Sequence, residues 1–397
     1  MDTKIKKILF ISHEASLSGA PILLLNLLKN IKTKTNISFD VLLIKDGNLY
    51  EDFAKIADHV FLLNPKPVQK SFVERNILRI KNILFPQKSA KNSIEKISEK
   101  IRSANYDLVY GNTVASLNIL FELQKKHPNC VIAIHELSFA LESLMEKNLI
   151  IEKMNTIKHI IAGSKAVAEN LINNYHIEEK KIKIIHSFVE KDTAIQTDKS
   201  TLKEKLGITA DELIIGIASS QELRKGTDLV PPLVKKISQK KPDLKFKFIN
   251  LGGDVKNSFL RSSKLDTKKL GIEDHIIYIN HTDVSNDYIN LFDIFLLLSR
   301  EDPFPLVMLT AAQLEKPIIA FKDSGGAEEF LENGRGIIVP YLDIDAFAEE
   351  IITLSENPDR MKELGGLIKT HLENNYSEEI IFNKNITFLE NISEHNY

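Results

Sequence analysis

The sequence predicts an α/β fold with two domains, each built around a doubly wound parallel sheet. Short apolar stretches of strand length alternate with helical patterns along most of the chain, which is typical of parallel sheets covered by helices on both faces. A polar segment at residues 190–205 interrupts this alternation, and 397 residues are too many for one ordinary hydrophobic core. We therefore place the first domain at residues 1–192 and the second at residues 193–375.

Each domain has its own series of predicted strands. In the first domain they cover residues 8–12, 41–44, 60–63, 108–110, 131–134, 160–162 and 182–185. In the second they cover residues 213–218, 246–251, 276–279, 292–298, 318–320 and 336–339. Helical patterns lie between most of them, for example at residues 22–31, 116–126 and 165–175. Because ligands bind at the carboxyl ends of the strands in such sheets, we expect two facing sheets to form a binding cleft.

The composition is that of an ordinary globular protein, with 43% hydrophobic and 27% charged residues. No apolar stretch approaches the roughly 20 residues that a membrane-spanning helix needs, and the first residues show no cleavage site typical of a signal peptide. The single cysteine, Cys130, lies in a predicted strand, which favours a buried and inert thiol. We therefore expect a cytoplasmic protein.

The net charge of -2 hides a difference between the two halves of the chain. Residues 1–190 hold 27 Lys and Arg against 20 Asp and Glu, whereas the remainder holds 25 against 34. A basic half and an acidic half suggest two domains with different partners. Neither half is basic enough, or rich enough in interleaved aromatic residues, to predict nucleic-acid binding.

The most informative stretch covers residues 299–321, SREDPFPLVMLTAAQLEKPIIAF. An apolar run of strand length precedes it, and its two prolines stand where a helix would begin. The unpaired N–H groups at such a helix N-terminus could hold a phosphate, and here they belong to Phe304, Leu306 and Val307, beside Pro305. Asp302 would instead accept hydrogen bonds from neutral hydroxyls, as on a sugar ring. The alternative is an ordinary strand-to-helix crossover whose acid caps the helix.

Two strand ends in the first domain carry candidate binding residues. The loop at residues 13–21 opens a helix, and Gly19 would let the backbone approach a ligand closely, although a plain turn is equally compatible with these residues. The loop does not match the G-x-G-x-x-G pattern of dinucleotide-binding proteins. His135 follows the strand at residues 131–134. It is either a structural histidine or a neutral imidazole that hydrogen-bonds a ligand and so orients it.

Three strand ends in the second domain are also candidates. Arg224 and Lys225 are adjacent cations in a turn near a helix start, where they could neutralise a diphosphate or simply be solvated. The other candidates lie at the ends of the predicted strands in this domain. They are Ser219, Leu251, Gly252 and His281.

These strings resemble the donor-site signature of glycosyltransferase family 4, whose members are retaining enzymes of the GT-B fold. The resemblance rests on EDPFPLV at residues 301–307, on the pair Lys316 and Pro317, and on GGAEE at residues 325–329. It covers almost the whole chain and is strongest at residues 213–340. The family pattern places seven residues between an acid and a glutamate, and here Asp302 matches the acid whereas Thr310 stands at the glutamate position. Thr310 therefore lacks the carboxylate that usually holds the ribose.

The resemblance assigns roles to residues of this sequence. It implies three catalytic residues, His135, Lys225 and Asp302. It also implies contacts to the donor diphosphate and sugar from Gly19, Arg224, Lys225, Phe304, Pro305, Leu306 and Val307. Contacts to the nucleotide are implied for Ser219, Leu251, Gly252, His281 and Thr310. Serines occupy positions 219 and 220, where family members usually carry an arginine, so Arg224 would have to replace it. The last helix, within residues 376–397, is expected to pack back on the first domain.

The activity that the resemblance implies is transfer of a sugar from a nucleotide-diphosphate sugar, with retention at the anomeric carbon and without cofactor or metal. A glycan or a lipid-linked molecule is the expected acceptor, as in polysaccharide biosynthesis. Because of Thr310, a non-catalytic nucleotide-sugar-binding protein is an alternative, and a nucleotide-sugar epimerase of similar architecture is another. The D-x-D pair Asp343 and Asp345 opens a predicted helix, so helix capping explains it better than metal binding.

A basic amphipathic pattern at residues 71–102 has two interpretations. Val73, Ile77, Ile80 and Leu84 share one helical face, and lysines and arginines outnumber glutamates around them. This pattern is typical of a helix that lies on an anionic membrane, at the inner face of the cell membrane for a cytoplasmic protein. It is also compatible with an ordinary domain helix whose lysines are solvated.

Overall fold

The computed structural model describes residues 3–64, 99, 101, 103–190, 194–254 and 256–394. The chain divides into two compact units. The first comprises Met1–Gly163, Ala168–Ile185 and Phe382–Tyr397, and the second comprises Ser164–Val167 and His186–Ile381. The main division thus falls at residue 186, whereas the sequence places it after residue 192. The basic amphipathic pattern at residues 71–102 lies outside the described residues, apart from Glu99 and Ile101.

The first unit contains a parallel sheet with the strand order β3-β2-β1-β4-β5-β6-β7. The strands are β1 Lys7–Ser12, β2 Ser38–Lys45, β3 His59–Asn64, β4 Leu108–Asn112, β5 Cys130–Ile134, β6 His159–Ala162 and β7 Ile182–Ile184. Each of the seven predicted strands is therefore confirmed. The central strands β4 and β5 are buried along their whole length, as a sheet with both faces covered requires.

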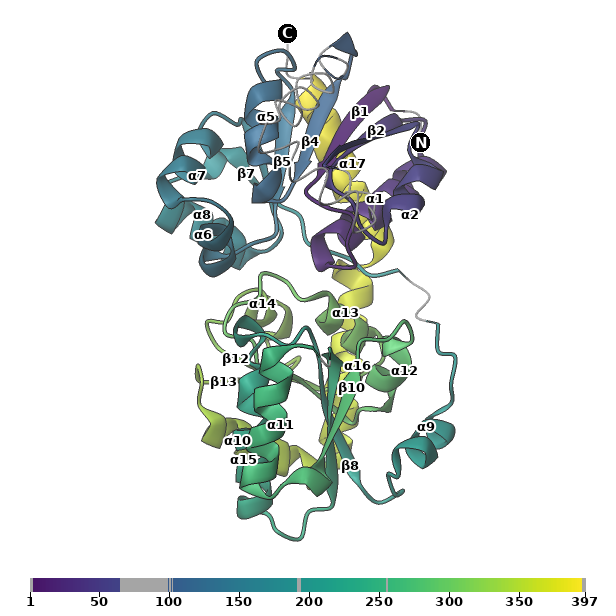
Figure 1. Ribbon diagram of the computed structural model, residues 1–397, viewed down its shortest axis with the longest axis vertical. Coiled ribbons are helices and arrows are strands. Elements are labelled where there is room, and N and C mark those ends of the chain that lie inside the picture. The colour runs from purple at the N-terminus through teal and green to yellow at the C-terminus, as the bar shows by residue number, and fades with distance from the viewer. Residues whose placement is uncertain are drawn as a thin grey trace, which may run out of the picture. The chain divides into compact units, whose positions relative to one another are not determined.

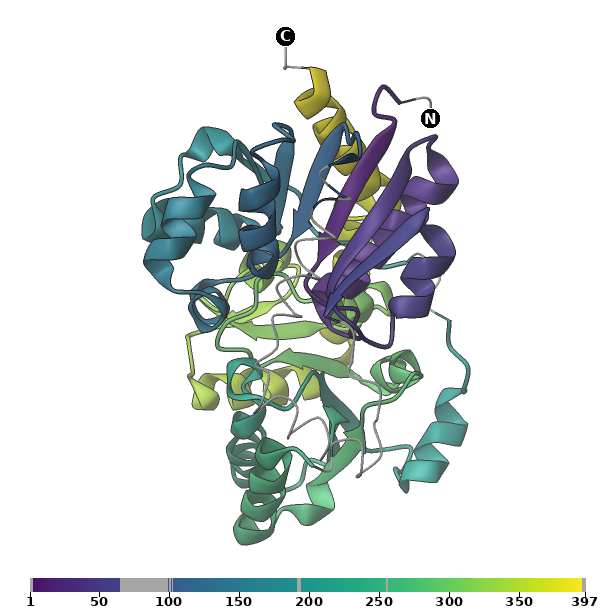
Figure 2. The ribbon, with the colours of Figure 1, turned by 45° about the horizontal axis from the view of Figure 1, so that its top comes forward.

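Helices cover both faces of this sheet (Figures 1 and 2). They are α1 Gly19–Lys34, α2 Tyr50–Ile56, α5 Leu117–Leu123, α6 Ser138–Leu144, α7 Lys147–Met154 and α8 Lys165–Tyr175. Cys130 is buried, and burial raises the pKa of its thiol to about 12, as expected for an inert cysteine. The last helix, α17 Glu378–Glu394, begins in the second unit, and its residues from Phe382 onward belong to the first.

The second unit contains another parallel sheet, with the strand order β10-β9-β8-β11-β12-β13. The strands are β8 Leu213–Ala218, β9 Phe246–Gly253, β10 Ile276–Asn280, β11 Ile294–Leu297, β12 Ile318–Phe321 and β13 Ile337–Val339. The six predicted strands of this half are confirmed. The direction of the strand order reverses between β8 and β11, and the loops that follow these two neighbouring strands meet at one edge of the sheet.

Helices also lie on both faces of the second sheet. The helices of this unit are α9 Lys199–Leu206, which packs against α12, α10 Val230–Lys240, α11 Ser258–Leu270, α12 Ser285–Leu291, α13 Leu306–Gln313, α14 Ala327–Leu331, α15 Ile344–Ser355 and α16 Pro358–Asn375. Local sequence explains several of their ends. Asp198 caps the start of α9, and Gly207 ends it in the left-handed conformation. Asp343 accepts a hydrogen bond from the Ala346 N–H at 2.9 Å, so the first acid of the D-x-D pair caps α15 as expected.

The core of the second unit consists of fully buried aliphatic and aromatic side chains between the sheet and α10 and α15. It includes Phe248 and Ile294 from the sheet and Val234 and Phe347 from the helices. This packing holds the strand ends rigidly, so the loops that leave them can present side chains at fixed positions. In the part of the chain that the structure describes, no helix is both long and apolar enough to cross a bilayer.

Candidate functional site

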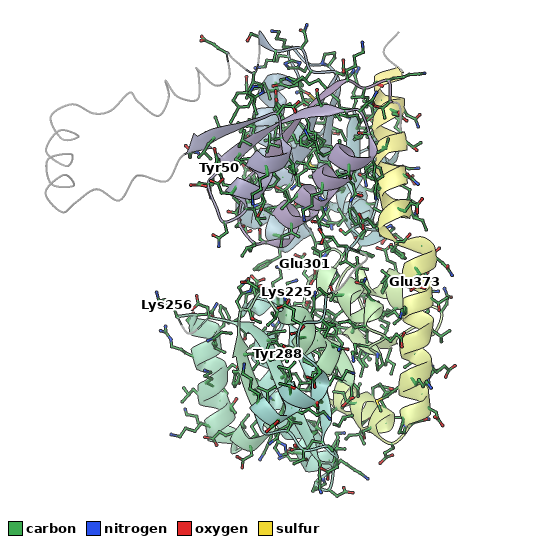
Figure 3. All side chains as sticks on the ribbon, turned by 90° about the vertical axis from the view of Figure 1, so that its right-hand side faces the viewer. Tyr50, Lys225, Lys256, Tyr288, Glu301 and Glu373 are labelled. Carbon is green, nitrogen blue, oxygen red and sulfur yellow. The ribbon has the colours of Figure 1, made fainter. Side chains whose placement is uncertain are left out.

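The loops after β8 and β11 bring Lys225 and Asp302 together, although the two residues are 77 positions apart in the sequence. The ammonium of Lys225 donates a hydrogen bond to the carboxylate of Asp302, and both side chains are largely buried. Ser299 adds a second donor, with its Oγ 3.3 Å from the same Asp302 oxygen. Lys225 and Glu301, the residue before Asp302, are labelled in Figure 3 at one end of the second unit. The site therefore holds a cation and an acid in direct contact.

The Lys225 turn lies very close to the end of β11. Residues Leu223–Lys225 form a single 3-10 turn that ends at Gly226, whose φ is +66°. A Cβ atom at Gly226 would stand 1.8 Å from the carbonyl oxygen of Leu298. Both the backbone conformation and the lack of space therefore require glycine here, and this close approach places Lys225 beside Asp302.

The loop after β12 holds the backbone on both sides of Asp302. The Asp302 N–H donates to the carbonyl of Ser324 at 2.7 Å, and the Gly326 N–H donates to the carbonyl of Asp302 at 3.0 Å. A Cβ at Gly326 would stand 2.1 Å from the carbonyl oxygen of Pro303, so the two loops touch through their backbones. The GG pair of the sequence signature thus supports the EDPFPLV turn.

Helix α13 begins directly after this turn, and no side chain caps its N-terminus. Its N-cap is Pro305, which has no side-chain group to accept hydrogen bonds from the first N–H groups. The side chain of Phe304 faces elsewhere, because its ring packs on those of His186, Tyr376 and Phe330 at centroid distances of 4.9, 5.6 and 6.0 Å. The backbone of Phe304, and not its ring, is therefore the group that could contact a ligand.

A small cavity joins several of the predicted residues. Ser219, Lys225, Asp302 and Val307 all line it, together with Ser299 and apolar residues of β8 and β11. The Lys225 turn and the first turn of α13 thus border one space. The cavity has a volume of about 10 Å³, room for about one water molecule, so it shows that the two loops meet rather than where a ligand would lie.

The residues assigned to the nucleotide lie at the neighbouring strand ends. Gly252 has a φ of +106°, and a Cβ there would stand 2.3 Å from the carbonyl oxygen of Ser219, so the ends of β8 and β9 are in close contact. The N–H of His281 donates to the carbonyl of Gly253 at 2.8 Å. Leu251 is buried in β9. Ser219, Leu251, Gly252 and His281 therefore form one continuous edge.

The side chains of Thr310 and Arg224 both form hydrogen bonds within the protein. The Thr310 hydroxyl donates to the carbonyl of Leu306 at 3.4 Å, one turn earlier in α13. The Arg224 guanidinium donates to the carbonyl of Glu301 at 3.0 Å and to the carboxylate of Glu222 at 2.9 Å. Arg224 thus links the two loops of the site, a contact that the sequence does not reveal.

Gly19 and His135 belong to the first unit, where each follows a strand. Gly19 is the first residue of α1, and a Cβ there would meet no atom within 4 Å, so packing within the protein does not require glycine. Burial lowers the pKa of His135 to about 4, so its imidazole is neutral at physiological pH. This agrees with a hydrogen-bonding role rather than a charged one.

Two residues beside His135 escape sequence analysis. Thr113, at the end of β4, has a φ of +75°, which is rare for a β-branched residue. Glu136 is buried, and its carboxylate accepts hydrogen bonds from the His135 N–H at 2.9 Å and from Val114 and Thr113. It thereby ties the ends of β4 and β5 together. A buried acid directly after a strand is the signal that could have identified it.

We expect Glu136 to make stability depend on pH. Burial raises the pKa of Glu136 to about 7, although the hydrogen bonds from His135, Val114 and Thr113 oppose this. A carboxyl whose pKa is higher in the folded than in the unfolded state contributes stability below about pH 4.5, and this contribution is lost as the pH rises through about 7. Urea unfolding of the wild type and of Glu136→Gln should therefore diverge between pH 5 and pH 8, with the wild type losing more stability. An equal loss in both proteins would refute this assignment.

Two family models match the chain over most of its length. The model of glycosyl transferases group 1 matches residues 198–368, and the model of Glycosyltransferase Family 4 matches residues 57–193. Among curated proteins, the chain is 26% identical over 205 residues to N-acetyl-alpha-D-glucosaminyl L-malate synthase of Bacillus anthracis, covering 50% of this chain and 52% of that protein. It is 27% identical over 198 residues to a GDP-mannose-dependent monoacylated alpha-(1-6)-phosphatidylinositol monomannoside mannosyltransferase of Corynebacterium glutamicum, covering 47% and 50%. The chain spans about half the length of the curated relatives it matches.

Solved structures match nearly the whole chain. Anabaena HepE in complex with UDP and glucose has a TM-score of 0.79 and 19% identity, covering 97% of this chain and 99% of that one. Sucrose-phosphate synthase from Thermosynechococcus elongatus has a TM-score of 0.74 and 15% identity, covering 98% and 99%. These likenesses, with the two parallel sheets, define the class as a GT-B fold. With the two family models and the signature strings, the chain belongs to glycosyltransferase family 4.

Proposed function

We propose that this protein transfers a sugar from a nucleotide-diphosphate sugar to a hydroxyl group of an acceptor. The observation that carries the proposal is the contact of Lys225 with Asp302 in a cavity that the first turn of α13 also lines. A diphosphate leaving group gains negative charge as its bond to the sugar breaks. The Lys225 ammonium and the uncapped N-terminus of α13 are fixed positive groups that would stabilise this charge. The match to HepE, solved with UDP and glucose, supports a nucleotide-sugar donor.

The reaction we propose retains the configuration at the anomeric carbon and needs no metal ion. The acceptor oxygen bonds to the anomeric carbon on the face from which the diphosphate departs, and the acceptor proton passes to a departing phosphate oxygen. Lys225 and the amides at the start of α13 supply the positive charge that a metal would otherwise supply. Asp302 orients sugar hydroxyls, and neutral His135 donates or accepts one further hydrogen bond to the hexose.

The acceptor in this proposal is a glycan or a lipid-linked molecule, as in polysaccharide biosynthesis. The relative named as a phosphatidylinositol mannoside mannosyltransferase supports an acceptor with a lipid part. The proposal includes a cytoplasmic location with contact to a membrane through the basic pattern at residues 71–102. A single free cysteine is compatible with a reducing compartment.

Thr310 favours a second candidate function, that of a nucleotide-sugar-binding protein without turnover. The hydroxyl of Thr310 already bonds to the carbonyl of Leu306, and a threonine has no carboxylate with which to hold a ribose. Such a protein would retain the Lys225 and Asp302 contact and bind a nucleoside diphosphate. It would not convert the donor.

Calorimetric titration of the full chain with UDP, GDP and ADP is the first test, followed by NMR of incubations with the matching nucleotide sugar in the presence of EDTA. We expect one nucleotide to bind, and the sugar to be released or transferred with its anomeric configuration unchanged. Binding without conversion favours the binding protein, and an isomerised sugar formed without acceptor favours an epimerase. The absence of binding to all three nucleotides would contradict the proposal.

A further inference from the structure

Arg300 holds the Lys225 turn from both sides. Its guanidinium donates to the carbonyl of Leu223 at 2.7 Å and to the two carboxylate oxygens of Asp228 at 2.8 Å each. Leu223 stands two residues before Lys225, and Asp228 three residues after it. One side chain therefore contacts the turn on either side of the lysine. Hydrogen bonding to Asp228 is also the main reason why the pKa of Arg300 is raised.

The backbone of Arg300 strengthens the same connection. Its N–H donates to the carbonyl of Arg224 at 2.8 Å, and Arg224 returns a hydrogen bond from its side chain to the carbonyl of Glu301. Arg300 lies two residues before Asp302, which is the partner of Lys225. The contacts of Arg300 thus connect the Lys225 turn to the loop that carries Asp302 and hold the two residues in position relative to each other.

The geometry of these contacts requires arginine. A fork of planar N–H groups can serve both oxygens of a carboxylate and a neighbouring carbonyl at once, whereas a lysine ammonium is a point charge that cannot hold the same bidentate arrangement. Isolated ion pairs at the surface usually contribute little to stability, roughly 0–1 kcal/mol. The pair of Arg300 and Asp228 is partly exposed, so its role is better explained by geometry than by stability.

We propose that Arg300 is a positioning residue that holds the Lys225 turn where its ammonium meets the diphosphate of the donor. The proposal rests on the proposed function, because Lys225 is the group that contacts the ligand. Arg300 itself acts only through Lys225 and Asp228. Loss of the Arg300 side chain should therefore weaken nucleotide binding only while Lys225 is present.

The test is a double-mutant cycle on the full chain, with UDP, GDP and ADP as probes in calorimetric titration. Arg300→Gln should weaken the Kd of the nucleotide that binds by roughly tenfold, because small misplacements of a positioned group are costly. In a Lys225→Ala background the same change should cost less than about twofold, because the group it positions is gone. Arg300→Lys should resemble Arg300→Gln. A purely structural role predicts the same factor in both backgrounds, and that result would overturn the proposal.

The matched control is Arg360→Gln. Arg360 pairs with Glu363 at 2.7 Å on α16, as an ordinary exposed ion pair within one helix. It should change neither nucleotide binding nor the melting temperature appreciably. Wild-type affinity in Arg300→Gln would also overturn the proposal.

A second measurement needs no ligand and separates this proposal from the proposed function. Hydrogen exchange of the backbone amides at residues 222–228 should become faster in Arg300→Gln and stay unchanged in Arg360→Gln. If none of the three nucleotides binds the wild type, the proposed function fails, and faster exchange at residues 222–228 still supports Arg300 as the residue that holds this turn. Unchanged exchange there overturns the positioning role whatever the nucleotides do.

Discussion

Replacing Lys225 by alanine should lower kcat/KM for the nucleotide sugar by roughly 10²-fold or more, the effect of removing one preorganised charge-stabilising donor. The ammonium is the charged group of the second unit that contacts Asp302 in the cavity lined by Val307. Without this ammonium, only the amides at the start of α13 would stabilise the charge on the departing diphosphate. Steady-state kinetics with the donor identified by titration is the measurement, and unchanged turnover would show that Lys225 has another task.

Two further variants separate charge from folding in this experiment. Lys225→Ala also leaves the buried Asp302 carboxylate without its cation, which is expected to lower stability. Lys225→Gln retains a hydrogen-bond donor for Asp302, so it should unfold at a higher temperature than Lys225→Ala while losing similar activity. Lys236→Ala is the control, because Lys236 forms an ion pair with Asp345 at 3.1 Å on α10 and α15, away from the site. It should leave kcat/KM within about twofold of the wild type, as expected of an exposed ion pair.

Gly226→Ala should both destabilise the second unit and abolish nucleotide binding. An alanine in the left-handed conformation costs roughly 1–2 kcal/mol. Its Cβ would also stand 1.8 Å from the carbonyl oxygen of Leu298, so the Lys225 turn or the end of β11 has to move. Overpacking of this kind lowers the free energy of unfolding by a further amount of roughly 1–3 kcal/mol. Gly226→Ala should therefore cost more stability, by about this amount, than the same substitution at a glycine with free space around it. Urea unfolding and titration with the nucleotide that binds are the measurements.

Gly207→Ala provides a close control for the clash. Gly207 has the same φ of +66° at the end of α9, but a Cβ there would meet no atom within 4 Å. Its substitution should therefore cost only the conformational part, roughly 1–2 kcal/mol, and leave nucleotide binding intact. If both variants lost stability equally and bound nucleotide equally well, the close approach of Gly226 to β11 would not matter for the site.

Much of the fold follows from local patterns. Buried parallel strands appear in the sequence as short apolar runs, and each predicted strand was found within a few residues of its expected bounds. The longest prediction, residues 292–298, is trimmed to Ile294–Leu297, because Phe292 still ends the preceding helix. The division between units falls at His186 rather than after residue 192, because the contacts of a linker are not encoded in its composition.

The candidate site is only partly visible in the sequence. The strings around Asp302 and Lys225 mark the turns that carry the site, since glycines, prolines and charges at strand ends have local causes. They do not show that Phe304 packs its ring on that of His186, or that Arg224 bonds to Glu301. Those orientations depend on neighbours that are distant in the chain.

By itself, therefore, the sequence determined the two parallel sheets, the positions of the turns and the residue types available at them, because strand length, helix starts and turns respond to neighbouring residues. Only the tertiary structure decided which side chains meet. The contacts of Lys225 with Asp302 and of Arg300 with Asp228 each join residues more than 70 positions apart. Such pairs form because β8 and β11 are adjacent in the sheet and Gly226 allows their loops to touch, a condition that no local pattern specifies.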